Sequence, residues 1–160
     1  HRNFYYMISA SVYDSKYQAA NAKWYNTRFN TNHALTITAG KEWNLTKNGK
    51  NRVLGVNIKS VYVGGFHYTP IDLDASVKAG TTVYDESRNF DSQNPDYYRL
   101  DTRISLKRNY KKVTSTVALD IQNTTNRQNA GWQNFNAKTG KIDYFYQAPL
   151  IPILSYRLEF

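Results

Sequence analysis

The sequence predicts an all-β fold, an antiparallel up-and-down meander of about six long strands that belong to a transmembrane β-barrel. Three observations predict it. Apolar and polar residues alternate in segments of about ten residues or more, the period of a strand with two different faces. The connections between these segments alternate between short and long. Aromatic residues make up 15% of the chain and gather near the segment ends. In a membrane strand these ends lie at the level of the lipid headgroups, where amphipathic aromatic rings are favoured.

The six strands are expected near residues 3–14, 34–45, 53–66, 98–109, 113–126 and 143–160. In the first, apolar residues stand at every second position from Phe4 to Val12, with Met7 and Ser9 between them. The second, "LTITAGKEW", and the third, "VLGVNIKSVY", alternate in the same way. Each therefore has one apolar and one polar face.

The last three strands show the same period. The fourth, "YYRLDTRISLKRNY", is the clearest, and the fifth contains "VTSTVALDIQ". The sixth ends in "PILSYRLEF". Pro149 and Pro152 cannot donate to a strand ladder, so the start of the sixth strand stays open: it lies near residue 143, or only after Pro152.

The connections predict which ends of the strands lie together. "TKNGKN" and "NYKK" are short turns, whereas residues 15–32, 69–95 and 127–141 form long polar loops. In a meander all three long loops share one end, as in outer-membrane barrels with short periplasmic turns and long extracellular loops. The expected location is the bacterial outer membrane, with the C-terminus periplasmic. A soluble sandwich with one wet face is the alternative for any single strand.

Composition excludes several classes of protein. A net charge of +9 is compatible with a nucleic-acid partner, but the clusters of basic residues lie in two turns, one of them with Lys111 and Lys112, and no basic helix or RNA-binding motif appears. We therefore expect no nucleic acid. There is no cysteine, hence no disulfide and no Cys-based metal site. No apolar run approaches the roughly 18 residues of a membrane helix.

No catalytic constellation stands out. His1, His33 and His67 are scattered, with no two at metal-ligand spacing. The acidic pair Asp85 and Glu86 lies in a loop without a partnering base. We expect neither enzymatic activity nor a cofactor.

Charged residues on the polar strand faces are candidates for the barrel interior. A Lys or Arg facing lipid at the bilayer midplane would cost about 2–4 kcal/mol, so the alternation should turn these residues inward. There they would pair with one another, contact a plug or touch a ligand. The lumen-facing set is Lys59, Arg99, Asp101, Arg103, Lys107, Asp120, Arg157 and Glu159.

The long loops are better candidates for ligand capture, because binding residues concentrate on loops held by a rigid scaffold. Aromatic rings there can stack on a glycan or peptide, and amides and carboxylates can hydrogen-bond it. The same composition also occurs in solvated loops with some local packing. The candidates are Trp24, Tyr25, Tyr84, Asp85, Asp91, Asn94, Trp132 and Phe135.

Six strands are too few to close a membrane barrel, because the smallest single-chain barrels have about eight. Three explanations are open: the chain continues upstream of His1, several copies share one barrel, or the loops contain two more strands. No initiator methionine or signal peptide is present, so we expect a processed chain or a piece of a longer one.

The chain resembles the C-terminal barrel region of TonB-dependent outer-membrane receptors of the Bacteroidetes type, which include SusC-like transporters and receptors with a carboxypeptidase-regulatory-like domain. The resemblance lies in "GKEW", "KNGKN", "YTPIDLDAS", "YDESRNFDSQNPDYYRLDTRISLKRN", "KKVTSTVALDIQNTTNRQN" and "LIPILSYRLEF". It implies a barrel of about 22 strands around a plug, of which this chain supplies the last six. The plug and the earlier strands have no counterpart in the chain.

The resemblance also implies function and partners. Such receptors take up a nutrient (glycan, peptide or metal chelate) with energy delivered through TonB from the inner-membrane proton gradient. The expected partners are outer-membrane lipid, the rest of the barrel and its plug, the TonB system, the barrel-assembly machinery and a SusD-like surface lipoprotein. A small outer-membrane barrel acting as an adhesin or structural protein is the alternative, and a soluble ligand-binding sandwich is a third hypothesis.

The C-terminal alternation is a candidate assembly signal. A terminal aromatic residue with apolar residues two, four and six positions earlier would be presented on the periplasmic side. The residues concerned are Leu154, Tyr156, Leu158 and Phe160.

Overall fold

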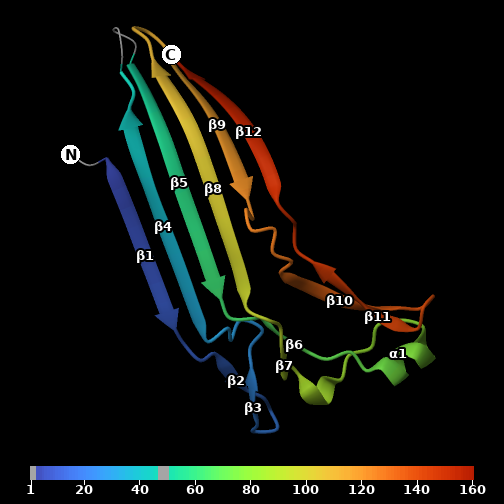
Figure 1. Ribbon diagram of the computed structural model, residues 1–160. Coiled ribbons are helices and arrows are strands. Elements are labelled where there is room, and N and C mark those ends of the chain that lie inside the picture. Colours follow the sequence, from blue (N-terminus) through green and yellow to red (C-terminus); the bar gives the residue numbers. More distant parts are fainter. Residues whose placement is uncertain (1–2, 47–50) are drawn as a thin grey trace.

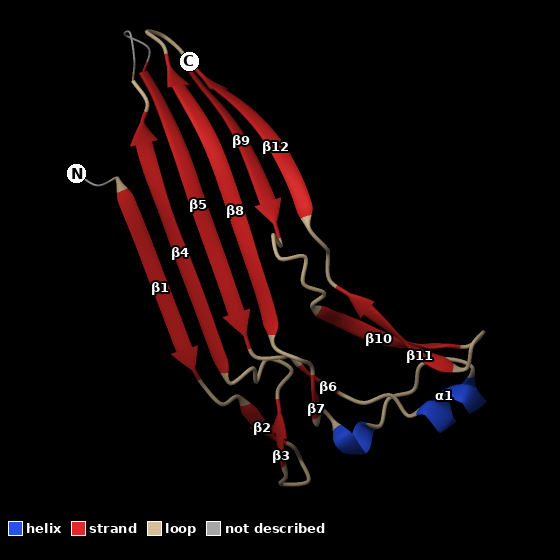
Figure 2. Cartoon of the chain, viewed as in Figure 1, coloured by secondary structure: helices blue, strands red, loops and turns tan. Residues whose placement is uncertain are grey.

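The computed structural model contains one six-stranded antiparallel sheet and three smaller strand pairs (Figures 1 and 2). It describes residues 3–46 and 51–160. The tip of the predicted turn "TKNGKN" (residues 47–50) and His1 lie outside this range. The long strands are β1 (Phe4–Val12), β4 (His33–Asn44), β5 (Asn51–Val63), β8 (Tyr97–Asn109), β9 (Thr114–Gln122) and β12 (Ile151–Glu159).

The long strands follow one another in the sheet in the order β1-β4-β5-β8-β9-β12, and each pairs antiparallel with its neighbour. The prediction of an all-β meander of about six long strands is therefore confirmed. Within the described residues β1 and β12 are the two edges of this sheet. The sheet is open, not closed on itself.

The long connections lie together at one end of the sheet, with the C-terminus at the opposite end (Figure 1). The first carries the hairpin β2 (Lys16–Gln18) and β3 (Trp24–Asn26). The second carries β6 (His67–Tyr68), α1 (Leu73–Ala79), η1 (Glu86–Arg88) and β7 (Ser92–Gln93). The third carries the hairpin β10 (Ala130–Asn136) and β11 (Lys141–Tyr146).

Cross-strand register gives the sheet one apolar and one polar face. The pairs Ile8↔Ile37, Ile58↔Thr102 and Ile104↔Leu119 lie on the apolar face. All eight charged residues of the predicted lumen-facing set lie on the polar face. The cross-strand pairs that show this are Lys59↔Asp101, Asn57↔Arg103, Arg103↔Asp120, Lys107↔Thr116, Val61↔Arg99, Thr116↔Arg157 and Thr114↔Glu159.

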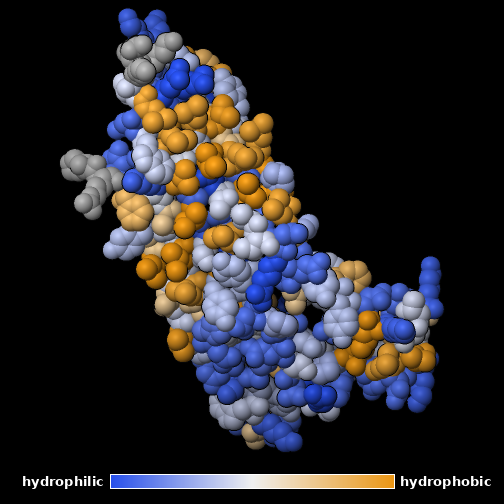
Figure 3. Space-filling view, in the orientation of Figure 1, coloured by the Kyte–Doolittle hydropathy of each residue, from blue (hydrophilic) through white to orange (hydrophobic). Residues whose placement is uncertain are grey.

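The apolar face is exposed in this chain. Ile8 is 61%, Ile104 51% and Leu154 76% accessible, and the one buried apolar residue among residues 3–46 and 51–160 is Ala118. Apolar residues gather over the middle and upper part of the sheet in Figure 3, whereas hydrophilic residues cover its loop end. Soluble monomers rarely expose so large an apolar surface.

The largest differences from the predicted strand boundaries lie at the loop end of the sheet. The fifth strand stops at Gln122 instead of residue 126, because Asn123 and Asn126 adopt left-handed φ values of 50° and 52°. The sixth strand begins at Ile151 instead of residue 143. Residues 141–146 belong to β11, which pairs with β10 outside the main sheet.

Pro152 lies in the edge strand β12 and is paired with Ile121 of β9. A proline is tolerated there because an edge strand needs ladder donors on one side only. The third strand ends at Val63, three residues before the predicted end, at Gly64 and Gly65. The long loops do contain additional strands, but none of those described joins the six-stranded sheet.

The short helix α1 was not predicted. Asp72 caps its N-terminus by accepting a hydrogen bond from the Ala75 N–H at 2.9 Å, and Gly80 ends it with φ 67°. Ser76 is fully buried, and its Oγ accepts a hydrogen bond from the Val83 N–H. No helix among the described residues is long and apolar enough to cross a membrane.

Candidate ligand-binding cleft

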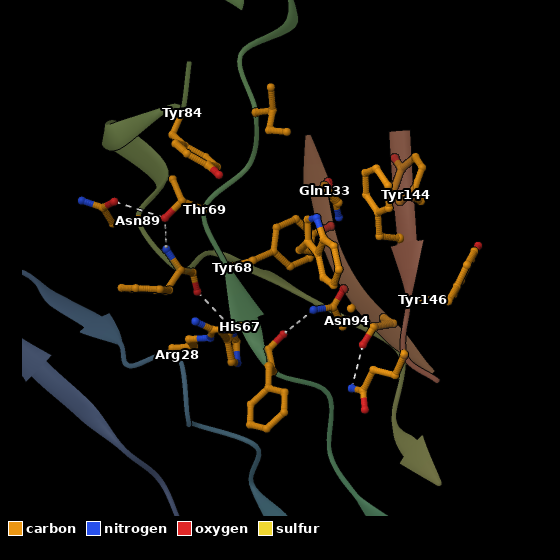
Figure 4. A pocket seen from close by; sticks show the side chains of 18 of the residues that line it. Arg28, His67, Tyr68, Thr69, Tyr84, Asn89, Asn94, Gln133, Tyr144 and Tyr146 are labelled. Carbon is orange, nitrogen blue, oxygen red and sulfur yellow. Dashed lines mark hydrogen bonds between the residues drawn. The ribbon is translucent and has the colours of Figure 1, made fainter. Parts of the chain in front are cut away.

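A cleft of about 640 Å³ lies at the loop end, between the second connection and the β10–β11 hairpin (Figure 4). Its size is that of a small-molecule or peptide site. Aromatic rings dominate the wall, and amide side chains and two charges of opposite sign join them. The aromatic lining residues are Phe66, Tyr68, Tyr84, Phe90, Trp132, Tyr144, Phe145 and Tyr146.

His67 fixes one wall of the cleft. It is 8% exposed, and its Nδ1 lies 2.9 Å from the Phe90 carbonyl oxygen. Its backbone N–H donates to the Arg28 carbonyl, which ties the first connection to the second. Thr69 Oγ1 accepts from the Phe90 N–H at 3.2 Å and holds this residue in a left-handed conformation with φ 52°. The wall therefore rests on buried polar contacts.

Gly65 lets the two strands of this wall approach each other. A Cβ at this position would lie 1.6 Å from the Asn94 carbonyl oxygen, so only glycine fits. Asn94 in turn donates from both its backbone N–H and its Nδ2 to the Phe66 carbonyl, at 3.0 and 3.1 Å. This side of the cleft is consequently preorganised.

The opposite wall is the β10–β11 hairpin, which an amide side chain anchors to the main sheet. Asn129 is 5% exposed; its Oδ1 accepts from the Tyr98 N–H and its Nδ2 donates to the Tyr98 carbonyl. The side chain thus pairs with β8 as a neighbouring backbone would. Gln147 Nε2 donates to the Ala130 carbonyl at 3.0 Å and holds the base of the hairpin together.

The hairpin has a bulge at Gly131, between the pair Ala130↔Tyr146 and the regular register that begins at Trp132↔Phe145. A Cβ at Gly131 would approach the Phe145 carbonyl oxygen to 2.8 Å. Beyond the bulge the rings of Trp132 and Phe145 stack with centroids 5.1 Å apart and an interplanar angle of 8°. This stacked pair forms a flat apolar platform at the cleft.

Of the predicted loop candidates, some line the cleft, some support the segments around it, and the rest lie elsewhere. Tyr84 and Trp132 both line the cleft, as does Asn94. The Phe135 N–H donates to Thr82 Oγ1 at 2.9 Å and joins the two walls. Asp85 caps η1 through the Ser87 N–H.

The other candidates lie elsewhere. Trp24 and Tyr25 belong to β3, where Tyr25 stacks on Tyr17 with centroids 5.8 Å apart. Asp91 forms an ion pair with Arg88 at 2.9 Å. The structure does not bring them to the cleft lining.

Sequence reasoning missed most of the cleft. The prediction assigns Phe66 and Tyr144–Tyr146 to strands, because they fall in alternating stretches, and leaves Tyr68 between a strand and a loop. The dense aromatic runs "FHY" and "YFY" at the borders of the long loops were the available signal. The fold of the second and third connections toward each other was not encoded in any periodicity.

The polar face of the sheet carries a second group of charges, arranged as ion pairs. Arg99 Nε lies 2.6 Å from Asp101 Oδ1, and Arg157 lies 2.8 Å from Glu159. The Arg103 Nη1 lies 3.1 and 3.0 Å from the two carboxylate oxygens of Asp120 on the next strand. A shallow hollow of about 350 Å³ is lined by residues that include Lys59, Asp101, Arg103 and Asp120.

Asp96 connects the sheet to the loops. Its Oδ2 accepts from the Tyr62 hydroxyl at 2.5 Å, its Oδ1 accepts from the Gly65 N–H at 3.3 Å, and its backbone carbonyl accepts from Arg127. His33 Nε2 lies 3.8 Å from the same carboxylate. The Tyr62 hydrogen bond is the main cause that lowers the pKa of Asp96 below its ordinary value of 3.8.

The candidate assembly residues lie on the edge strand. Leu154, Tyr156 and Leu158 share the apolar face of β12 and are 76%, 64% and 45% exposed, and Phe160 beyond it is 97% exposed. Among residues 3–46 and 51–160 no cluster of His, Asp or Glu side chains could hold a metal ion. Comparison with family models, with curated proteins and with solved structures gives no match.

Proposed function

We propose that this chain is part of the lipid-facing wall of an outer-membrane β-barrel that belongs to a TonB-dependent nutrient transporter. The observation that carries the proposal is the cross-strand register, which places apolar rows on one face and all eight charges of the lumen-facing set on the other. In lipid an outward Lys or Arg would cost about 2–4 kcal/mol, whereas an inward one can pair. The exposed apolar face is then covered by acyl chains.

The open edges support the same proposal. In hydrocarbon each unpaired backbone group costs several kcal/mol, so β1 and β12 must pair with further strands. The remaining strands of the same barrel are the partners that the sequence resemblance implies. The ion pairs of the polar face would then contact the plug inside the barrel.

The long connections become the extracellular loops, and the short turns become periplasmic. The aromatic cleft then lies outside the cell, where it can capture the nutrient before transport. Lipid, the plug, TonB, the assembly machinery and a SusD-like lipoprotein are the partners of this proposal. Leu154, Tyr156, Leu158 and Phe160 would form the assembly signal on the periplasmic side.

Cysteine labelling tests the orientation, because the chain has no cysteine of its own. Lys138 lies exposed between β10 and β11, and Lys111 lies exposed in the short turn between β8 and β9. In the full-length protein, with any other cysteine removed, a bulky polyethylene-glycol maleimide should label Lys138→Cys on intact cells. It should label Lys111→Cys only after the outer membrane is permeabilised.

Equal labelling of both variants on intact cells would contradict the orientation. Recovery of the protein as a folded, detergent-free monomer in buffer would favour the soluble sandwich and overturn the membrane proposal. The upstream coding sequence separates the transporter from a small adhesin barrel. A plug domain and further strands support the transporter, and a signal peptide directly before His1 supports the adhesin.

A further inference from the structure

The outer edge of β10 has backbone groups that β11 does not use. The Phe135 N–H donates to Thr82 Oγ1 on the neighbouring loop, so it points away from β11. In an antiparallel pair, residues alternate between exchanging both backbone hydrogen bonds with the partner and exchanging neither. The register is regular from Trp132 to Asn136, so Gln133, two residues before Phe135, also points its N–H and C=O outward.

This edge of β10 borders the cleft at Gln133. The second connection closes the edge of β10 at Phe135 through Thr82, and Gln133 itself lines the cleft. Figure 4 shows Gln133 on the hairpin across from Tyr68 and Thr69 of the other wall. The outward N–H and C=O of Gln133 can each form a hydrogen bond with the backbone of another extended chain that lies in the aromatic cavity.

From these observations we infer that the cleft binds a short peptide in extended form, added as a third strand to the outer edge of β10 at Gln133. Successive side chains of an extended peptide point to opposite faces. On one face they would meet the stacked Trp132 and Phe145 rings, and on the other Tyr144, which is paired with Gln133. The aromatic lining thus supplies contact area to both sets of side chains.

Charge at the cleft fits the termini of such a peptide. Arg28 and Glu86 both line the cavity. Neither belongs to an ion pair formed within the described part of the chain. A free carboxylate and a free amine are the groups that would pair with them. A neutral glycan could stack on the rings but would leave both charges and the Gln133 backbone groups unmatched.

The inference deepens the proposed function and rests on it for the exposure of the cleft at the cell surface. The test uses the full-length protein in detergent micelles and the pentapeptide Ala-Thr-Val-Thr-Ala with free termini, followed by isothermal titration. We expect binding that weakens about tenfold or more when the central peptide nitrogen is methylated, because methylation removes a ladder donor and blocks close approach. Capping both termini should weaken it severalfold.

Two protein variants locate the contact. Gln133→Pro removes the outward N–H at a strand edge, where proline is tolerated, and should weaken peptide binding about tenfold. Gln133→Ala removes only the side chain and keeps the backbone N–H, so it should weaken binding much less than Gln133→Pro does. Near-ultraviolet circular dichroism checks that both variants are folded; if Gln133→Pro does not fold, the methylated peptide decides.

Equal affinity for the parent and methylated peptides would overturn the inference. So would the absence of peptide binding up to about 10 mM, or binding of maltopentaose in its place, which would make the cleft a glycan site. None of these results would touch the wall assignment. A failure of the cysteine-labelling test, in contrast, would overturn the proposed function while leaving peptide binding measurable.

Discussion

The two faces of the main sheet are built from the same strands and differ in almost every physical property. One face carries exposed aliphatic and aromatic rows, for example Ile8 and Ile104 at 61% and 51% accessibility. The other carries Arg99–Asp101 and Arg103–Asp120 ion pairs. Within residues 3–46 and 51–160, neither face is covered by another layer of helices or strands (Figure 2).

The alternation of apolar and polar residues therefore gives this sheet two different exposed faces, and it does not pack the apolar face into a core. A soluble sheet buries its apolar face and wets its polar face. Here the buried apolar content of the described residues is Ala118 alone, on the polar face next to Ser105 and Ser155. Under the proposed function, lipid would cover the apolar face and the barrel contents would cover the polar face.

The largest effect should come from placing a charge on the apolar face. Ile8 and Met7 are neighbours in β1 with 61% and 60% exposure, but they point to opposite faces. Ile8→Arg should destabilise the full-length protein by about 2–4 kcal/mol in phosphatidylcholine vesicles, because its guanidinium would face acyl chains. Urea titration followed by tryptophan fluorescence measures the difference.

Met7→Arg is the matched control. Its side chain lies on the polar face opposite Thr38, so the cost should stay under about 1 kcal/mol. Equal costs for the two variants would remove the distinction between the faces. It would also remove the main support for the wall assignment.

The fold was largely predictable from the sequence because strand alternation is local. The period of two fixes which residues share a face, so the set from Lys59 to Glu159 could be assigned to one face without coordinates. The strand ends were less predictable. They depend on left-handed residues such as Asn123. They also depend on whether residues 141–146 join the main sheet or pair with β10, and an alternating pattern is compatible with both.

The second largest effect is expected at Asp101 on the polar face. Its Oδ1 accepts from Arg99 Nε at 2.6 Å and from the Asn123 N–H at 2.9 Å, where β9 ends. Asp101→Ala should cost about 1–3 kcal/mol by leaving both donors without a partner. Asp101→Asn keeps an acceptor and should cost less; a larger loss in the asparagine variant would argue against this hydrogen-bonding role.

A smaller effect is expected for the cross-strand pair of Arg103 and Asp120. The side chains are 45% and 27% exposed, so solvent screens the 3.0 Å contact. A double-mutant cycle with Arg103→Ala and Asp120→Ala should give a coupling of about 0.2–1 kcal/mol. A coupling well above this range in the full-length protein would mean that plug or ligand groups enclose the pair.

The cleft could be predicted only in part. Tyr84 and Trp132 were identified because aromatic residues in long loops are candidate binding residues. Their meeting depends on contacts between distant segments, such as Phe135 with Thr82 and Asn129 with Tyr98. Side-chain amides that replace backbone partners leave no periodic signal, so the cavity had to be seen in the structure.

The smallest effect should be the pH dependence of the loop end, at Asp96. Its pKa is lowered in the folded chain by the Tyr62 hydroxyl, the Gly65 N–H and the nearby His33 and Arg127 charges. A depressed carboxyl pKa stabilises the fold above the unfolded pKa of about 4, and this contribution is lost as the pH falls through the lower folded value. Hydrogen-exchange protection of the Gly65 amide, corrected for intrinsic rates, should therefore decrease below about pH 4. In Asp96→Asn the protection should be lower at neutral pH and lose this dependence; an unchanged acid transition in that variant would assign the effect to other carboxylates.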